Sequence, residues 1–502
     1  MSDDQQPVFD FLADPATHGG AKVKRIDTHA ASVFLTATRA LKIKRAVRFP
    51  FLDFSTLEKR KSACTAEIEV NRLYAPSIYR GVVAITRDAG GRLAIDGDGT
   101  PVEWAVEMAR FDEMQTLDHL ASKGRIDAAL ADQLGRAVAK AHAAVPVVKD
   151  AGFADTLAEI IDQNHAEMRA ASDLFASHEV DGLTAASRAA LSHLRPLLDA
   201  RERDGCVRRC HGDLHLGNIV LIDNAPVLFD AIEFNPALAT IDVFYDLAFL
   251  LMDLIERDLG AAANAVLNRY LAETGRDGDL DALAALPLLM SLRAAIRAKV
   301  TAARPHRDAA MENSARDYFT LAQRLIAPPR PALLAVGGLS GTGKSVFARA
   351  LAPAILPLPG AILLRSDVMR KSLFGSAETE RLPASAYTPE VTAKVYATLG
   401  ARAQRALAAG HSVIVDAVFA KRAERDAIAK SAPGMFRGLF LTADLDTRVA
   451  RVGGRAGDAS DADATIARAQ EQYDLGALEW TEVDAAGTPD ETLRRGKTAV
   501  GL

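Results

Sequence analysis

The sequence GLSGTGKS, from Gly338 to Ser345, matches the phosphate-binding pattern GxxxxGK[ST] at every defined position. In this pattern, backbone N–H groups of a glycine-rich loop surround a phosphate, the lysine reaches the β- and γ-phosphate oxygens, and the hydroxyl ligates Mg²⁺. Apolar residues 331–336 predict a buried strand leading into the loop, and residues 346–351 predict a helix whose N-terminus faces the anion. We therefore predict an α/β P-loop NTPase domain with a parallel sheet. Its expected ATP contacts are Gly338, Ser340, Gly341, Thr342, Gly343, Lys344 and Ser345, and Ser345 is also expected to bind Mg²⁺.

A second motif, HGDLHLGN from His211 to Asn218, has the D-x₄-N spacing of a kinase catalytic loop. In such a loop the aspartate orients the attacking hydroxyl and accepts its proton, and the asparagine binds metal. Residues 219–229 predict a hairpin that brings Asp230 back beside the loop. We predict Asp213 as the catalytic base, and Asn218 and Asp230 as Mg²⁺ ligands. The alternative is that both aspartates only cap turns.

A kinase site also needs a strand lysine for the phosphates and a helical glutamate that holds this lysine. Lys42 and Lys44 lie two residues apart on a predicted strand, so their side chains share a face. The next predicted helix opens with a capping box at residues 55–58 and carries Glu67 and Glu69. We predict that Lys42 pairs with Glu67 in the ATP site, whereas Lys44 and Glu69 are expected on the solvated surface.

HGDLHLGN resembles the catalytic loop of the aminoglycoside phosphotransferase-like kinases, with Leu216 where that family usually has proline. The resemblance implies an α+β protein-kinase-like bilobal domain, with an N-lobe at about residues 20–108 and a C-lobe at about residues 109–326. It also implies that Asp246 is a structural brace. Residues 26–34 contain no glycine-rich phosphate loop, so the sequence does not indicate which residues of the N-lobe bind phosphate.

Acidic and basic residues also follow the predicted strands after the P-loop. Residues 362–370 combine an apolar stretch with Asp367 and Arg370, and they resemble the acceptor site of polynucleotide kinases, gluconate kinases and zeta-toxin-like kinases. The resemblance implies that Asp367 activates the acceptor hydroxyl and that Arg370 holds the acceptor. A further predicted strand ends at Asp416, whose carboxylate is suited to Mg²⁺.

A segment farther along resembles a nucleotide-kinase lid, in which mobile arginines neutralise the γ-phosphate charge. Arg448, Arg451 and Arg455 lie there, and the alternative is a solvated arginine face. We predict Arg451 and Arg455 in the ATP site. Over its whole length the chain resembles the bacterial family that fuses an aminoglycoside phosphotransferase-like domain to a P-loop kinase domain.

Chain length and a proline cluster predict the domain organisation, and the net charge bears on the kind of partner. The chain has 502 residues, enough for two or three domains. A proline cluster at residues 327–331 predicts a boundary between a first domain at residues 1–329 and a second at residues 330–502. The net charge is −5, and neither half is strongly basic, which argues against a protein built to grip nucleic acid.

Cysteine usage and the N-terminus indicate the compartment. Three cysteines are too few for a disulfide framework, and the N-terminus is polar and acidic, so we expect a cytoplasmic protein without a secretory signal or membrane span. Cys206, Cys210 and His211 lack a fourth ligand at zinc-finger spacing, so we expect no metal cluster there.

The sequence therefore predicts an ATP- and Mg²⁺-dependent phosphotransferase with two kinase domains, each of which transfers a γ-phosphoryl group to a hydroxyl of a small molecule or sugar. Three alternatives stay open: 5′-hydroxyl polynucleotide kinase activity in the second domain, aminoglycoside-type antibiotic phosphorylation by the first, or one domain acting as a regulatory ATP sensor. We expect a small-molecule acceptor as the partner, no membrane association, and nucleic acid only under the first alternative. The oligomeric state is left open.

Overall fold

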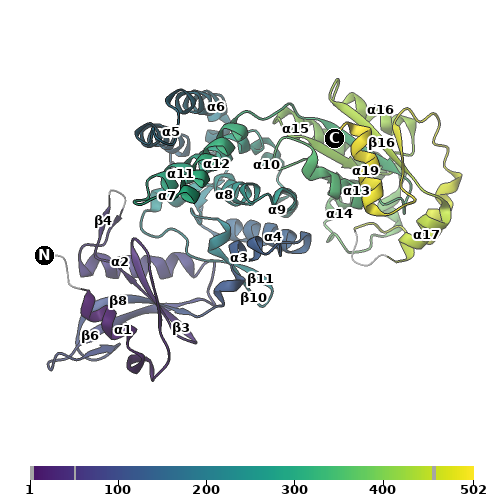
Figure 1. Ribbon diagram of the computed structural model, residues 1–502. Coiled ribbons are helices and arrows are strands. Elements are labelled where there is room, and N and C mark those ends of the chain that lie inside the picture. The colour runs from purple at the N-terminus through teal and green to yellow at the C-terminus, as the bar shows by residue number, and fades with distance from the viewer. Residues whose placement is uncertain (1–4, 50–51, 455–458) are drawn as a thin grey trace. The chain divides into compact units, whose positions relative to one another are not determined.

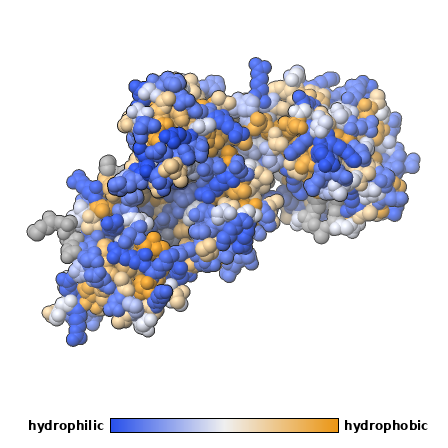
Figure 2. Space-filling model, in the orientation of Figure 1, coloured by the Kyte–Doolittle hydropathy of each residue, from blue (hydrophilic) through white to orange (hydrophobic). Residues whose placement is uncertain are grey.

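A computed structural model describes residues 5–49, 52–454 and 459–502. By its internal contacts the chain forms two compact units, one of residues 1–158 and 198–253 and the other of residues 159–197 and 254–502. Among the described residues, no helix is both long and apolar enough to cross a membrane. The face shown in Figure 2 mixes hydrophilic residues with scattered hydrophobic ones, as most folded proteins do.

The first unit contains a six-stranded antiparallel sheet in the order β1-β2-β3-β8-β6-β7 (purple and blue in Figure 1). Its strands are β1 (Lys24–Asp27), β2 (Ala31–Leu35), β3 (Arg39–Lys44), β6 (Tyr79–Arg87), β7 (Leu93–Ile95) and β8 (Thr100–Ala109). Helix α1 (Gln6–Ala13) packs on the face that carries Leu41 and Ile43. Helix α2 (Leu57–Asn71) packs on the other face, which carries Ala40. Because side chains alternate along a strand, Lys42 and Lys44 point to the α2 face.

The start of α2 differs from the predicted capping box. Thr56 is the N-cap and accepts a hydrogen bond from the Lys59 N–H at 3.3 Å. The Ser55 hydroxyl instead donates to the Asp53 Oδ1 atom at 2.6 Å. The predicted capping box starting at Ser55 is therefore wrong: the N-cap is one residue later, because Asp53 holds the serine side chain before the helix begins.

Helices and short two-stranded sheets complete the first unit. The helices are α3 (Leu117–Ser122), α4 (Ala128–Ala144), α7 (Pro236–Ala239) and most of α8 (Val243–Glu256). Strand β4 (Arg48–Phe49) pairs with β5 (Leu52–Asp53). Strand β9 (Val207–Arg209) pairs with β12 (Thr240–Asp242), and β10 (Ile219–Ile222) pairs with β11 (Ala225–Leu228). The β10–β11 turn contains Asp223 and Asn224 at φ 51° and 61°, the left-handed conformations that a two-residue hairpin turn requires. This is the hairpin that the sequence predicted before Asp230.

The second unit contains a five-stranded parallel sheet in the order β14-β15-β13-β16-β17. Its strands are β13 (Leu333–Gly338), β14 (Ile362–Arg365), β15 (Val413–Asp416), β16 (Phe436–Thr442) and β17 (Thr481–Asp484). The helices after the P-loop are α13 (Lys344–Leu351), α14 (Ser366–Leu373), α15 (Pro389–Ala408), α16 (Arg422–Lys430), α17 (Leu445–Gly453), α18 (Ala464–Ala469) and α19 (Pro489–Val500). Phe347 and Leu351 of α13 and Val500 of α19 pack on Val336 and Leu441 of the sheet. The parallel sheet that the sequence predicted for the P-loop domain is confirmed.

The second unit also contains helices that precede the predicted boundary at residue 330. They are α9 (Gly260–Thr274), α10 (Asp277–Ala282), α11 (Leu286–Ala302) and α12 (Ala309–Ile326), with parts of α5 (Phe153–Ala170) and α6 (Ser177–Arg203). The Ser291 hydroxyl of α11 donates to the Ala322 carbonyl of α12 at 2.8 Å, which ties these two helices together. The boundary at residue 330 stays a prediction. The division by internal contacts instead places residues 159–197 and 254–329 in the same unit as the parallel sheet.

Candidate active sites

In the first unit, Lys42 lies between two carboxylates. Its Nζ atom is 2.9 Å from Glu67 Oε1 and 2.7 Å from Asp230 Oδ1. Strand β3 and helix α2 bring Lys42 and Glu67 together, and the β10–β11 hairpin delivers Asp230. Burial works against the charge of Lys42, but Asp230 and Glu67 raise its pKa well above the usual value. The sequence-predicted pair of Lys42 and Glu67 is thus present, and the lysine is held in its charged form.

Lys44 takes part in the same network. Its Nζ atom lies 2.5 Å from Glu67 Oε2 and also contacts Glu233. The expectation that Lys44 is a solvated surface residue is wrong, because the strand alternation that places Lys42 under α2 buries Lys44 there too. Glu69 is exposed, as expected. Sequence reasoning missed Glu233, for which the only signal was an acidic residue three positions after Asp230.

The HGDLHLGN motif forms a tight loop that ends in a short 3₁₀ helix (Leu216–Asn218). The Asn218 Nδ2 atom donates to both the backbone oxygen and the Oδ2 atom of Asp213, at 3.0 Å each. His215 Nε2 is 3.4 Å from the same Asp213 oxygen. Asp230 has a left-handed backbone at φ 62°, and its N–H donates to the Tyr79 hydroxyl at 3.0 Å. The loop therefore positions the Asp213 carboxylate through Asn218, while Tyr79 holds the backbone of Asp230.

A cavity of about 370 Å³ connects these groups. Lys42, Asp213 and Asp230 line it, together with the apolar side chains of Val33, Leu35, Ala40, Met108 and Phe229. An apolar cavity with a few charged groups is the usual form of a nucleotide or small-ligand site. The arrangement can hold a flat apolar ring beside a charged phosphate and metal region.

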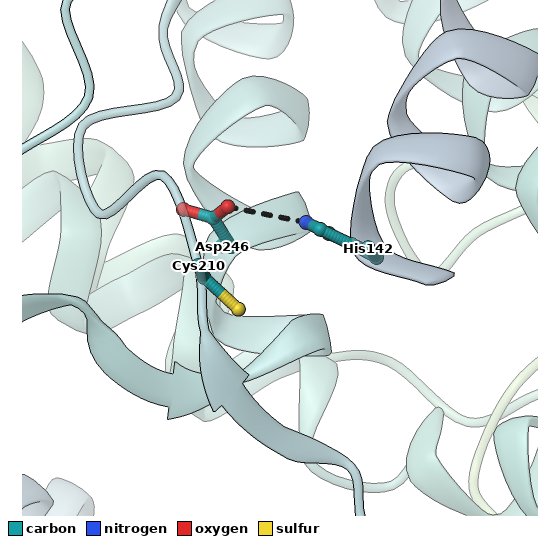
Figure 3. A group of neighbouring side chains, drawn as sticks. All are labelled: His142, Cys210 and Asp246. Carbon is teal, nitrogen blue, oxygen red and sulfur yellow. Dashed lines mark hydrogen bonds and ion pairs between the residues drawn. The ribbon is translucent and has the colours of Figure 1, made fainter. Parts of the chain in front are cut away.

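Asp246 braces the catalytic loop, as the sequence resemblance implied. Its carboxylate accepts hydrogen bonds from the His211 N–H at 3.1 Å and the Gly212 N–H at 2.9 Å. Figure 3 shows that His142 also points at Asp246, with 3.1 Å between His142 Nε2 and a carboxylate oxygen. Cys210 lies beside this pair, close enough for the three residues to form a metal-binding group. However, the Asp246 carboxylate already binds the loop N–H groups, and the Cys210 thiol is 3.5 Å from the Ile241 carbonyl, so the group acts as a brace.

In the second unit, the P-loop follows the central strand β13. Gly338, Gly341 and Gly343 have φ angles of 140°, 91° and 88°, so three of its positions require glycine. A Cβ atom at Gly341 would lie 2.4 Å from the Arg448 carbonyl oxygen, which shows how closely α17 approaches the loop. The Lys344 Nζ atom donates to the Leu339 carbonyl at 3.1 Å. Within the loop, the Thr342 hydroxyl donates to the Leu339 carbonyl at 2.8 Å. The Ser340 N–H donates to the side chain of Gln470, a residue far along the chain, at 2.6 Å.

The predicted magnesium ligands lie together at the carboxyl ends of the strands. The Ser345 hydroxyl donates to Asp416 Oδ2 at 2.5 Å. Arg365, which sequence reasoning missed, places Nη2 3.1 Å from the Ser345 hydroxyl and Nε 3.4 Å from the same Asp416 oxygen. Burial and the nearby Asp416 carboxylate raise the pKa of Asp367. A carboxylate with a raised pKa is suited to accept a proton.

Arg370 is buried beside Asp367 on α14. Its Nη1 atom donates to the Ala386 carbonyl at 2.6 Å, and its guanidinium lies 4.9 Å from the centre of the Tyr387 ring. The Arg370 Nε atom has no hydrogen-bond partner within the described ranges of the chain. A buried guanidinium N–H without a partner is costly, so this atom is suited to receive a polar group of a ligand.

The predicted lid arginines have different environments. Arg451 donates to the carbonyl oxygens of Ala485 and Gly487, both at 2.7 Å, so in this structure it holds the loop after β17. Its contact with ATP stays a prediction, and Arg455 lies outside the described residues. Arg448 is buried next to the P-loop and contacts Glu471, while its Nε and Nη1 atoms lack partners in the part of the chain that the structure describes.

Comparison with protein families places each site within a known type of domain. Residues 59–286 match the family model described as the phosphotransferase enzyme family, and residues 333–475 match the one described as the AAA domain. The first range contains Asp213, Asn218 and Asp230. The second contains the P-loop, Asp367 and Asp416. The chain is therefore a phosphotransferase with two kinase-type domains.

The chain is also similar to relatives of similar length and to two solved structures. Uncharacterized proteins of Mycobacterium tuberculosis and Mycobacterium bovis are 29% identical over 495 residues, covering 93% of this chain and 93% of theirs, so they match both domains. A gluconokinase from Sinorhizobium meliloti 1021 is 25% identical over 34% of this chain and 92% of its own, with a TM-score of 0.27. A choline/ethanolamine kinase family protein from Mesorhizobium loti is 16% identical over 65% of this chain and 95% of its own, with a TM-score of 0.40.

Proposed function

We propose that each kinase-type domain of this phosphotransferase uses ATP and Mg²⁺ to phosphorylate a hydroxyl group of a small molecule or sugar. The observation that carries the proposal is the shared cavity of the first unit, where Asp213 and Asp230 from a loop and a hairpin meet Lys42 from the sheet. A base, a metal-binding carboxylate and a phosphate-binding lysine are the groups that phosphoryl transfer needs in one place.

In the first domain, Asp213 would accept the proton of the acceptor hydroxyl, and Asn218 would keep its carboxylate aimed through the 3.0 Å hydrogen bond. Asn218 and Asp230 offer the oxygen ligands that Mg²⁺ prefers. Lys42 neutralises Asp230 in this structure and would turn to the α- and β-phosphates when metal takes its place at the carboxylate. Bound MgATP supplies the γ-phosphoryl group and the charge neutralisation around it.

In the second domain, the loop N–H groups and Lys344 would bind the phosphates, and Ser345 and Asp416 would hold the metal. The fit is supported by the 2.5 Å contact between the Ser345 and Asp416 oxygens, which is a typical pairing around a P-loop metal. Asp367 would accept the acceptor proton, and Arg370 would orient the acceptor through its unpartnered Nε atom.

Nucleotide titration of the full chain tests the two-site proposal. Calorimetry with MgATP is expected to show two sites per wild-type chain and one site in the Lys344→Ala variant, because the two sites share no residues. Loss of all binding in Lys344→Ala, or a single site in the wild type, would contradict the proposal.

A metabolite screen identifies the acceptors. Full-length Asp213→Asn and Asp367→Asn variants are each incubated with γ-labelled ATP and a small-molecule extract. We expect each variant to lose a different set of labelled products, because each substitution removes the base of one domain. Identical product sets in both variants would mean that only one domain transfers phosphate.

A further inference from the structure

Strand β14 carries two groups of the P-loop site at its end. Arg365, its last residue, contacts Ser345 and Asp416, and Asp367 follows two residues later. The position of this strand therefore sets the distance between the candidate base and the phosphate-binding loop. Yet among the described strands β14 lies at the edge of its sheet, with β15 as its one neighbour.

The outer edge of β14 is hydrogen-bonded by side chains of helix α9. On the inner edge, the Ile362 N–H donates to the Ser412 carbonyl at 2.8 Å. The next residue, Leu363, points its N–H outward, where it donates to Asn268 Oδ1 at 2.7 Å. The Ala361 carbonyl accepts hydrogen bonds from Asn268 Nδ2 at 3.1 Å and from Asn264 Nδ2 at 3.0 Å.

A carboxamide has the same donor and acceptor as a peptide group, so Asn268 replaces one peptide unit of a missing neighbour strand. Asn264 and Asn268 are four residues apart and share a face of α9. Asparagine is a poor helix former, and Asn264 is only 3% exposed, so its presence inside this alanine-rich helix needs the partner on β14. A Cβ atom at Gly360 would lie 2.7 Å from Asn264 Nδ2, which shows how closely the helix and the strand approach.

Ion pairs extend the contact to the segment after α14 and to helix α15. Arg269 of α9 contacts Glu378, in the segment after α14, at 3.1 Å. Asp281 of α10 contacts Arg405 of α15 at 2.5 Å. The residues of α9 and α10 lie in the range that matches the phosphotransferase family, whereas their partners lie in the range that matches the AAA domain.

We propose that Asn268 is a positioning residue for the P-loop domain, through which helix α9 of the phosphotransferase-family segment holds the strand that carries Arg365 and Asp367. The inference rests on the proposed function of the P-loop site and adds a physical link from one catalytic domain to the acceptor side of the other. Removing the Asn268 side chain leaves the Leu363 N–H without its acceptor and lets β14 move. A displacement of about 1 Å at a reacting group can cost roughly 100-fold in rate.

The test compares Asn268→Ala with Asn264→Ala and Asn313→Ala in the full-length chain. Asn264→Ala keeps the Leu363 hydrogen bond, and Asn313→Ala removes an exposed helical asparagine elsewhere. Hydrogen exchange read by mass spectrometry is expected to be faster for the peptide covering residues 361–367 in Asn268→Ala than in either control. Asn268→Asp is expected to give an intermediate rate, because it keeps an acceptor for Leu363 but places an oxygen against the Ala361 carbonyl.

Turnover is measured in an Asp213→Asn background, which suppresses the activity of the first domain. The measured quantity is the rate of ATP hydrolysis divided by the number of P-loop sites that hold nucleotide. We expect Asn268→Ala to lower this rate by about 10- to 100-fold with an unchanged ATP affinity and an unchanged number of sites. General destabilisation would instead lower the number of sites and leave the rate per site unchanged. Unchanged exchange, or faster exchange with an unchanged rate per site, would overturn the proposal. If ATP hydrolysis in the Asp213→Asn background persists when Lys344→Ala is added, the P-loop site is not its source. That outcome would contradict the proposed function, whereas the exchange result would still stand.

Discussion

The Leu216 N–H donates a hydrogen bond of 2.9 Å to the buried carboxylate of Asp253. Leu216 occupies the position where aminoglycoside phosphotransferase-like kinases usually have proline, which has no N–H. The backbone itself would accept proline, because His215 is extended and Leu216 is the first residue of a 3₁₀ turn. The contact therefore replaces the stiffness of a proline ring with a hydrogen bond to α8.

We predict that Leu216→Pro lowers the free energy of unfolding of the first unit by about 1–3 kcal/mol, because the Asp253 oxygen loses a buried donor. Urea denaturation measures the loss. Leu216→Met is the control, since it keeps the N–H and nearly the same volume. In an Asp253→Ala background the proline substitution should cost less, and an equal cost in both backgrounds would contradict the role of the hydrogen bond.

Substitutions of the two aspartates of the first site, Asp213 and Asp230, are expected to have different effects. Asp213→Asn should leave MgATP affinity nearly unchanged and lower turnover by about 10²–10⁴, the usual effect of losing a positioned base. Asp230→Asn should weaken metal-dependent nucleotide binding. ATP hydrolysis and calorimetry in a Lys344→Ala background separate the two effects. Equal losses of nucleotide binding in both variants would mean that Asp213 is structural or binds metal.

Glu67 and Glu69 form a matched pair on one helix. Glu67 is fully buried between Lys42 and Lys44, so Glu67→Gln should cost about 3–5 kcal/mol, as breaking a buried ion pair does, and should weaken ATP binding. Glu69→Gln should change stability by less than about 0.5 kcal/mol, because Glu69 is exposed. Trp104 fluorescence in a Trp480→Phe background follows unfolding of the first unit. Similar costs for both variants would contradict the buried network.

We expect His411 to make the stability of the second unit depend on pH. Burial lowers the pKa of His411 to about 4, and its Nε2 atom lies 2.9 Å from the Gly360 carbonyl. The unfolded chain takes up this proton below its usual pKa of about 6.5, but the folded chain does so only near 4, so stability falls as the pH drops between these values. The slope approaches about 1.4 kcal/mol per pH unit. His411→Gln keeps a donor for Gly360 and should remove this part of the slope in urea denaturation between pH 7.5 and 5.

Expression of fragments tests the predicted boundary at residue 330. Residues 330–502 contain the whole parallel sheet and its core, so we expect this fragment to fold. It lacks Asn264 and Asn268, so its β14 edge should exchange amide hydrogens faster and associate more readily than in a fragment of residues 254–502. A molten 330–502 fragment beside a well-folded 254–502 fragment would show that the boundary lies earlier.

The sequence alone was sufficient for features that depend on adjacent residues. The P-loop pattern, the D-x₄-N spacing and the hairpin with Asp223 and Asn224 in its turn each lie within one short segment, so local geometry determines them. The same patterns predicted both domain types, which the family matches confirm. The pairing of Lys42 with Glu67 could also be predicted, because a strand and the following helix have few ways to pack.

The tertiary structure decided which side chains from distant segments meet. The contact between Lys44 and Glu233 spans 189 residues, that between His142 and Asp246 spans 104, and that between Asn268 and Leu363 spans 95. No periodicity connects positions so far apart, and a buried lysine or helical asparagine looks the same in sequence as an exposed one. Only the packing of the folded chain removes water from these groups, and each then needs the partner that the fold brings to it.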